Sequence, residues 1–325
     1  QDARQALLAG IDPLEARKHP ADPPTPATGP TFRDVAEAYI DAHAAGWTSK
    51  KSPAQWRASL ATYAYPHIGG TAVDQVGVDG VLAVLRPIWT VKPETASRVR
   101  GRLEAVLGYA KAGGLRTGDN PAAWKDHLDH MLPAKSAVAK VEHYASLPYA
   151  DLPAFFARLQ AQDGASARAL EFTILTANRT SAVLGATWSE FDPNFKLWTI
   201  PAHRMKARAE LRVPLSAPAV ALLRRRLCIR TGDYVFPGQS GRKPLSDAAM
   251  LQVLHRMGLD ITPHGFRATF RTWVEEKTGY PEGVAEAALG HVQKDRVKAA
   301  YQRGDLLEKR RELMEHWARY CTGAE

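Results

Sequence analysis

The sequence predicts a mainly α-helical protein with two domains and one small antiparallel β-sheet. Its 325 residues correspond to about two domains, at about 150 residues each. Apolar residues recur at helical spacing through most of the chain after residue 30. The spacing changes to the alternation of β-strands between Lys196 and Ser216, which confines the expected sheet to the second domain.

The first 30 residues read as the remnant of a preceding domain followed by a linker. Residues 1–18 resemble the end of a helix, a break at Gly10-Ile11-Asp12-Pro13 and a short helical turn, so we expect further chain before them. Five prolines then forbid a helix and favour extended, semi-rigid chain. They are Pro20, Pro23, Pro24, Pro26 and Pro30.

Residues 31–131 predict a small, all-helical domain. Thr31 is a suitable N-cap for a helix whose apolar side contains Phe32, Val35 and Ile40. A second helix is expected from Ser52-Pro53, where proline is tolerated in the first turn. Further helices are expected at Val78–Pro87, at Pro93–Ala112 and around Trp124–Leu132.

Residues 132–140 predict a short interdomain linker, because Ala134-Lys135-Ser136-Ala137 is small, polar and suited to exposure. Residues 141–325 then form the mixed α+β domain. Its hairpin is expected to pair Leu197–Pro201 with Leu211–Leu215 around a basic tip at His203–Arg208. Its helices are expected after Asp151, at Ala167–Thr176, and from Ser216, Ser246-Asp247 and Pro263.

The charge of the chain indicates a polyanionic partner. Lys and Arg total 43 against 34 Asp and Glu, a formal net charge of +9, so nucleic acid is the first expectation. Charge alone leaves open an enzyme with a merely basic surface. The apolar runs are shorter than the roughly 18 residues that span a membrane. Cys228 and Cys321 are too few and too distant for a disulfide framework or a metal site, which favours the cytoplasm.

Several residues of the second domain are candidates for phosphodiester chemistry. His264 and Arg267 share one face of a helix and could converge on one phosphate, while Arg179 follows a buried helix, where a guanidinium needs an anion. Taken singly, each has a simpler reading. His264 and Arg267 could be a solvated pair, His291 a structural histidine and Tyr301 an interface aromatic.

Taken together, these residues resemble the tyrosine recombinase family, and more narrowly the integrases of prophages and genomic islands. The resemblance extends over nearly the whole chain. It rests on motifs in a specific order: Thr176-Ala177-Asn178-Arg179-Thr180-Ser181, Trp188-Ser189-Glu190-Phe191-Asp192, Met205-Lys206, Val213-Pro214-Leu215-Ser216, His264-Gly265-Phe266-Arg267, Leu289-Gly290-His291 and Ala300-Tyr301.

The resemblance implies an architecture and a set of partners. Residues 1–30 would hold the tail of an arm-binding domain, 31–131 a SAM-like core-binding domain and 141–325 the catalytic domain, the last two enclosing duplex DNA as a C-shaped clamp. The protein would integrate and excise a mobile element as a homotetramer on two attachment sites of double-stranded DNA. An excision factor and a host DNA-bending protein would be further partners, and the protein would associate with the nucleoid.

The resemblance also implies a role for each candidate. Arg179 and Arg267 would hold the scissile phosphate in place of a metal, and Tyr301 would attack it. His264 would accept the tyrosine proton, His291 would hydrogen-bond the phosphate and Lys206 would protonate the leaving 5′-oxygen. No cofactor and no metal are expected.

Two positions depart from the family pattern. Ala177 replaces the usual glycine before Arg179, and Ala182 replaces the glutamate three positions after it. The missing carboxylate would brace Arg179, so we expect Glu190 or Glu171 as a substitute.

Further residues, all basic except Thr95, are candidates for DNA contact. Four of them share one face of the helix at Pro93–Ala112, although such polar faces are usually only solvated. The candidates are Lys50, Lys51, Arg57, Lys92, Thr95, Arg98, Arg102, Arg242 and Lys243, with Gln55 beside the first group.

Three other functions compete with recombination. A type IB topoisomerase would use similar chemistry without exchanging partners. A metal-dependent nuclease would need converging carboxylates, for which Glu190 and Asp192 are available but resemble turn residues. A DNA-binding protein that has lost catalysis would have no reason to keep all six candidate residues.

Overall fold

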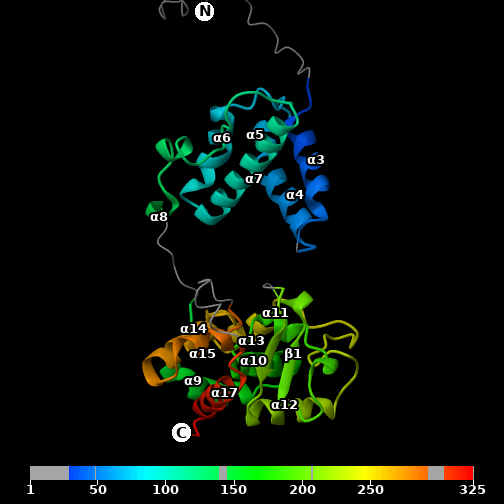
Figure 1. Cartoon of the computed structure of the whole chain (residues 1–325), viewed down its shortest axis with the longest axis vertical. Helices are drawn as coiled ribbons and strands as arrows, with labels where there is room; N and C mark the ends of the chain where they lie inside the picture. Colours follow the sequence, from blue (N-terminus) through cyan, green and yellow to red (C-terminus); the bar gives the residue numbers. More distant parts are fainter. Residues whose placement is uncertain (1–28, 48, 139–144, 206–207, 292–303, 325) are drawn as a thin grey trace, which may run out of the picture. The chain divides into compact units, whose positions relative to one another are not determined.

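The computed structural model of the chain describes residues 29–47, 49–138, 145–205, 208–291 and 304–324. The chain divides into two compact units, residues 1–142 and 143–325, and each is described by itself (Figure 1). The first is helical, and the second is mainly helical with a two-stranded antiparallel sheet. This confirms the fold class predicted from the sequence. No helix in the described ranges is long and apolar enough to cross a membrane.

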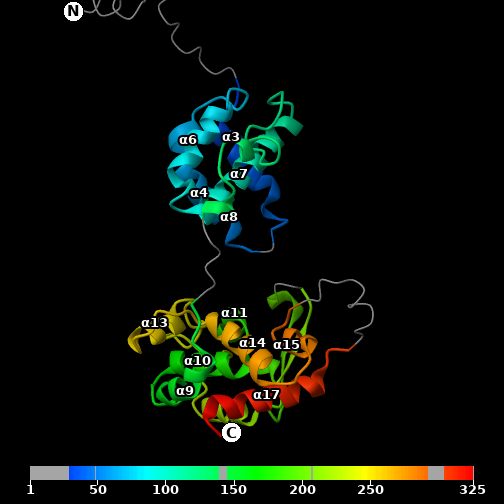
Figure 2. The same ribbon diagram turned by 90° about the vertical axis from the view of Figure 1, so that its left-hand side faces the viewer.

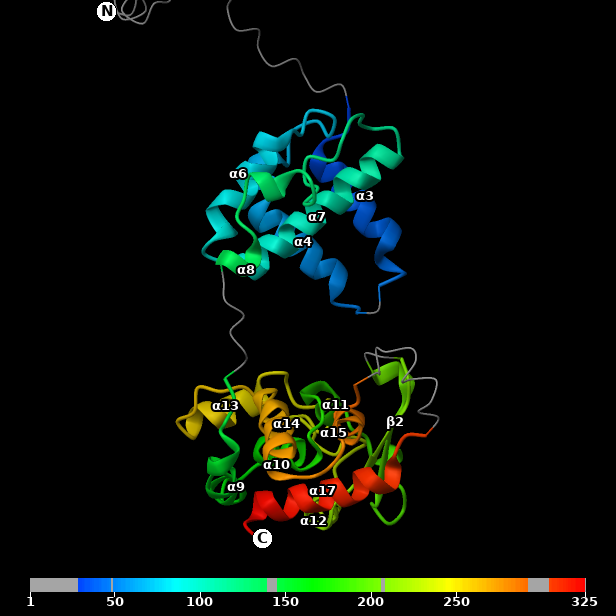
Figure 3. The same ribbon diagram turned by 60° about the vertical axis from the view of Figure 1, so that its left-hand side comes forward.

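The first unit is built around the long helix α7 (Pro93–Ala112), which contacts helices on both of its sides (Figure 3). Its buried face carries Val99, Leu103, Val106 and Leu107, at the spacing that the sequence predicts. The other elements are α3 (Phe32–Ala44), α4 (Ser52–Tyr63), α5 (Tyr65–Ile68), α6 (Val78–Trp89), the 3₁₀ helix η1 (Leu128–His130) and α8 (Lys135–Val138).

The start signals of this unit act as the sequence indicates. The Thr31 hydroxyl accepts a hydrogen bond from the Asp34 N–H at 3.2 Å, and the Asp34 carboxylate accepts one from the Thr31 N–H at 3.0 Å. This reciprocal capping box satisfies two N–H groups that have no partner within the helix. Pro53 lies in the first turn of α4.

Two predictions for this unit were wrong in detail. Helix α6 continues past Pro87 to Trp89, because Ile88 and Trp89 bury apolar surface that offsets the hydrogen bond that proline cannot donate. The helix expected around Trp124–Leu132 is only η1, since Asp126 adopts a left-handed φ of 58° that interrupts it. The expected linker contains the short helix α8, whose Lys135 forms an ion pair with Glu94.

The second unit is built around α10 (Ala165–Thr176), which contacts α9, α11, α12, α13 and α17. Its residues from Ala169 to Thr176 are all buried. Figure 2 shows α17 running beneath α14 and α15. The surrounding helices are α9 (Leu152–Gln160), α11 (Thr180–Leu184), α12 (Ala217–Leu227), α13 (Ala249–Arg256), α14 (Gly265–Lys277), α15 (Glu282–Ala288) and α17 (Leu307–Thr322). Short 3₁₀ helices are η2 (Tyr149–Asp151), η3 (Trp188–Glu190) and η4 (Ala202–Arg204).

The predicted hairpin is confirmed. Strands β1 (Leu197–Ile200) and β2 (Leu211–Pro214) pair antiparallel, with Leu197 opposite Pro214 and Ile200 opposite Leu211. Trp198 and Val213 point into the core. Helices α12, α13 and α14 begin just after their predicted starts, and α10 begins two residues before its predicted start at Ala167. Asp151 precedes α9 as expected, but its side chain makes no capping hydrogen bond, since η2 leads directly into the helix.

Trp317 of α17 provides a test of how this core is held. Its indole is fully buried, and Nε1 donates to the Ile174 carbonyl of α10 at 2.8 Å. We expect Trp317→Phe to lower the free energy of unfolding by about 2–3 kcal/mol, through a small cavity and the loss of one buried hydrogen bond. Tyr320→Phe removes a donor from the half-buried Tyr149 carbonyl and should cost about 1 kcal/mol. Urea unfolding measures both, and equal losses would contradict the argument.

Candidate active site

Arg267 joins three segments that are far apart in the sequence. From α14, its Nη1 donates to the Ala177 carbonyl at 2.7 Å and its Nη2 to the Leu289 carbonyl at 2.8 Å. The side chain is 5% exposed, so the guanidinium is both buried and oriented. Burial first, and then repulsion from Arg179, lowers its pKa to about 10, which still leaves it charged at neutral pH.

The end of α10 is shaped for this contact. Ala177 is the C-cap of the helix and has left-handed backbone angles, φ 49° and ψ 25°. That conformation costs a residue with a Cβ roughly 1–2 kcal/mol, a cost that glycine would avoid. The turn directs the Ala177 carbonyl to Arg267 and starts α11 with Arg179 as its N-cap.

Arg179 and Arg267 meet at the turn that follows α15. Arg179 Nη1 donates to the Gly290 carbonyl at 3.3 Å, next to the Leu289 carbonyl that Arg267 contacts. Gly290 has a φ of 60°, and a Cβ there would lie 2.8 Å from Leu211 Cδ2 and 3.6 Å from Met205 Cε. Glycine therefore suits this left-handed turn, which packs closely against Leu211 of β2 and Met205 of the preceding loop.

The two candidate histidines lie near these arginines. His291 Nε2 is 2.9 Å from Arg267 Nη2, and its Nδ1 is 2.6 Å from Glu286 Oε2. His264 is the N-cap residue of α14, and its side chain is partly exposed. Partial burial, followed by the positive charges of Arg267 and Arg179, lowers the pKa of His264. A neutral imidazole is therefore favoured near neutral pH, and that is the form that can accept a proton.

The four side chains form a positively charged group suited to an oxyanion. Among the described residues, no carboxylate forms an ion pair with Arg179 or Arg267. Planar guanidinium groups match the geometry of phosphate oxygens, so a bound phosphate would relieve their repulsion. The described residues also contain no group of three or more His, Cys, Asp or Glu that could hold a metal ion. Lys206 and Tyr301 lie outside the described residues.

The expected substitute for the missing brace at Ala182 was wrong. Glu171 pairs with Arg168 at 3.0 Å, and Glu190 pairs with Arg204, so neither carboxylate supports Arg179. The two glutamates are buried within their own ion pairs, which keeps them away from the arginines of the site.

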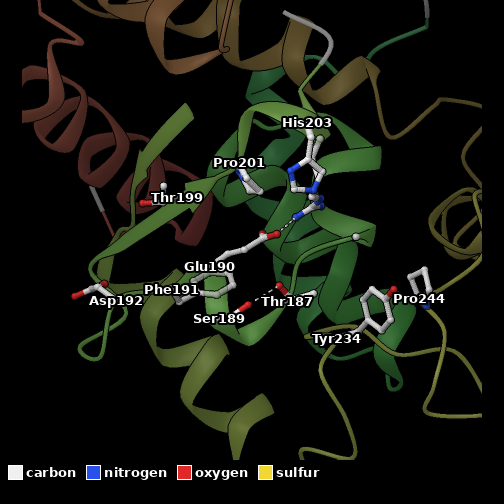
Figure 4. A pocket seen from close by; sticks show the side chains of 12 residues that line it. Thr187, Ser189, Glu190, Phe191, Asp192, Thr199, Pro201, His203, Tyr234 and Pro244 are labelled. Carbon is white, nitrogen blue, oxygen red and sulfur yellow. Dashed lines mark hydrogen bonds and ion pairs between the residues drawn. The ribbon is translucent and has the colours of Figure 1, made fainter. Parts of the chain in front are cut away.

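Arg204 holds the backbone of α11 at Ala182. Its Nη2 donates to the Ala182 carbonyl at 2.5 Å, while Glu190 Oε2 accepts from Trp198 Nε1 at 2.9 Å. A Cβ at Gly185 would lie 2.7 Å from Arg204 Nη2, so that position leaves room for the guanidinium. Glu190 forms an ion pair with Arg204 and lines a pocket, together with Thr187, Ser189 and Tyr234 (Figure 4).

The two carboxylates that a metal-dependent nuclease would need have other partners in this structure. Glu190 is committed to Arg204 and Trp198, and Asp192 Oδ1 accepts from the Leu197 N–H at 2.6 Å. Glu190 ends η3 and Asp192 lies in the turn between η3 and β1, as their sequence context indicates.

Reasoning from the sequence did not identify Glu286 or Arg204 as part of the site. Glu286 precedes His291 by five residues and Arg204 precedes Lys206 by two, so proximity to a candidate was a usable signal. Charged residues are too common on helices and loops for that signal to stand alone.

The candidate DNA-contact residues have different local environments. Arg57 forms ion pairs with Glu37 at 2.6 Å and Asp41 at 2.5 Å, and Arg102 donates to the Gln55 carbonyl at 2.9 Å. These two side chains are partly engaged within their own unit. Thr95 is half-buried. The exposed candidates are Lys50, Lys51, Lys92, Arg98, Arg242 and Lys243. Their contacts with DNA remain predictions.

Comparison with known proteins decides the family. The model of the phage integrase central domain matches residues 32–127, and that of the phage integrase family matches residues 147–306. Prophage integrase IntZ of Escherichia coli K12 is 34% identical over 324 residues, 98% of this chain and 77% of that protein. The chain belongs to the phage integrase family of tyrosine recombinases. This confirms the predicted family and the predicted enzyme class, a tyrosine-type site-specific recombinase.

Other relatives agree with this assignment. The integrase of Enterobacteria phage P4 is 31% identical, over 98% of this integrase and 75% of its own length. A lambda integrase(75–356) dimer bound to a COC′ core site has the same fold, with a TM-score of 0.65 and 15% identity over 81% of this chain and 96% of that one. The Tn1549 transposon integrase has a TM-score of 0.58 at 16% identity, over 83% of this chain and 99% of that one. A topoisomerase is not favoured by these matches.

Proposed function

We propose that this integrase cleaves and rejoins duplex DNA through a 3′-phosphotyrosyl intermediate, and so integrates or excises a mobile element. One observation carries the proposal. Arg179 and Arg267 contact adjacent carbonyls of the turn at Leu289-Gly290, with the His291 ring against Arg267. This arrangement supports the proposal that both guanidinium groups donate to the non-bridging oxygens of one phosphate.

The proposed chemistry gives each candidate a separate task. The Tyr301 hydroxyl oxygen forms a bond to phosphorus and the bond to the 5′-oxygen breaks, while the two arginines offset the charge on the transition state. His264 accepts the tyrosine proton, and Lys206 gives a proton to the leaving 5′-oxygen. The phosphotyrosyl bond retains the energy of the phosphodiester, so a 5′-hydroxyl from a partner strand can reverse the step.

The assembly is part of the proposal. Lambda integrase has been solved as a dimer bound to a core site and as a tetramer bound to a Holliday junction. By analogy, four copies of this integrase would act on two attachment sites of double-stranded DNA. Residues 31–131 would then bind the core site through their exposed basic side chains, and residues 141–325 would carry the reaction.

An adduct assay tests the proposed reaction. The protein is incubated in EDTA with a nicked duplex that carries its attachment site, and then separated under denaturing conditions. We expect a covalent protein–DNA adduct with the wild type and with Tyr320→Phe, and none with Tyr301→Phe, which lacks the nucleophile. Absence of the adduct from wild type, or its persistence in Tyr301→Phe, would show that the proposal is wrong.

A further inference from the structure

Glu286 links the candidate site to a group of charges outside it. This α15 residue accepts a hydrogen bond from His291 through Oε2 at 2.6 Å and one from Arg271 Nε through Oε1 at 3.0 Å. Its side chain is 34% exposed, so the carboxylate is partly withdrawn from water. It therefore holds the Nδ1 edge of the His291 ring, and Arg267 contacts the ring at Nε2.

The partners of His291 define its tautomer. A guanidinium can only donate hydrogen bonds, so His291 Nε2, 2.9 Å from Arg267 Nη2, must be the acceptor. The proton of the neutral ring is then on Nδ1, where it is donated to Glu286. In the absence of DNA, the arrangement favours the neutral Nδ1–H tautomer.

A bound phosphate would require Nε2 of His291 to donate a hydrogen bond instead of accepting one. Phosphate oxygens only accept hydrogen bonds, so Nε2 can donate to one only if it also carries a proton. The Nδ1 proton cannot be released to compensate, because a carboxylate accepts there. We infer that Glu286 is a positioning residue, which orients His291 and balances the positive charge that the ring gains when it donates to the scissile phosphate. This inference rests on the proposed function.

The charges around His291 make that balance necessary. Arg267 and His264 face it from α14, and Arg179 lies at the same turn from the start of α11. A second proton on the ring adds to this positive charge, and Glu286 is the carboxylate that contacts the ring among the described residues.

Arg271 keeps Glu286 ionised for this role. It is shared with two further carboxylates, Glu282 at 3.0 Å and Glu275 at 3.5 Å. Burial by itself would raise the pKa of Glu286, but the hydrogen bonds from His291 and Arg271 outweigh it and hold that pKa below its usual range. The carboxylate is therefore charged at neutral pH.

The test compares Glu286→Gln with a matched control. Glutamine keeps the size and the hydrogen bond but not the charge, whereas Glu282→Gln removes a carboxylate that contacts Arg271 and not His291. We expect Glu286→Gln to slow single-turnover adduct formation by about 10- to 100-fold, because the hydrogen bond from the ring is then made to a neutral acceptor and loses its charge assistance. DNA affinity should change by less than about twofold, and Glu282→Gln should behave as wild type.

A pH profile and a double mutant separate positioning from mere packing. The carboxylate favours the doubly protonated ring, so without it the cleavage rate should begin to fall at a lower pH as pH rises. Glu286→Asp, which keeps the charge, should recover part of this range. In a His291→Ala background, Glu286→Gln should cause no further loss.

Three results would overturn the inference: wild-type cleavage by Glu286→Gln, an equal loss in the His291→Ala background, or an equal loss in Glu282→Gln. Thermal unfolding of each variant shows whether a loss of rate reflects a loss of fold. A wild type that forms no adduct instead overturns the proposed function, so the two failures are distinguishable.

Discussion

Arg267→Lys is expected to slow single-turnover strand cleavage by about 10³-fold or more, the size of effect that removing a guanidinium from a phosphoryl-transfer site produces. The guanidinium of Arg267 uses Nη1 and Nη2 on the carbonyls of Ala177 and Leu289 and still has N–H groups for a ligand. A lysine ammonium is a single point charge with a different reach. It cannot keep both carbonyls and also hold a phosphate.

The matched control is Arg168→Lys. Arg168 also donates to several backbone carbonyls of the catalytic unit, including Leu159 at 2.9 Å and Gln162 at 2.7 Å, and its side chain is 18% exposed. It does not contact the described residues of the candidate site, so its loss should lower stability without lowering cleavage per folded molecule. Adduct formation within about tenfold of wild type in folded Arg267→Lys would contradict the role of Arg267.

Arg204→Gln is expected to lower the free energy of unfolding by about 3 kcal/mol. The Glu190 side chain is 8% exposed and that of Arg204 is 16% exposed, so the variant leaves a carboxylate buried without its ion-pair partner. The double variant Glu190→Gln, Arg204→Gln should lose less stability than the sum of the two single variants, since no buried charge remains. Urea unfolding measures the cycle. By contrast, Arg311→Gln breaks the exposed pair with Glu308 and should cost less than about 1 kcal/mol.

Arg204→Gln should also slow cleavage, and by different amounts for two kinds of leaving group. Arg204 ties η4, just before Lys206, to the Ala182 carbonyl next to the candidate site. If Lys206 is the proton donor, loosening this tie should slow cleavage of a normal phosphodiester. It should have much less effect on a 5′-bridging phosphorothiolate, because a thiolate leaves without needing a proton. Equal slowing of both substrates would contradict a link between Arg204 and Lys206.

The local elements could be predicted because their signals are local. Helix α7 runs from Pro93 to Ala112 as its apolar spacing and its leading proline indicate, and β1 and β2 follow from the alternation on either side of the basic tip. The errors arose where packing outweighed such signals. Ile88 and Trp89 extend α6 past a proline, and the left-handed Asp126 limits the helix that was expected at Trp124.

By itself, the sequence determined the family, the enzyme class and the candidate residues, because these follow from the types of residue and their order along the chain. The tertiary structure decided which groups support them. Arg267 meets the carbonyls of Ala177 and Leu289, Glu286 accepts from His291, and Arg204 donates to the Ala182 carbonyl. Every residue carries a backbone carbonyl, so no side-chain pattern can say which carbonyls a guanidinium will contact. That choice depends on which turns the fold brings together.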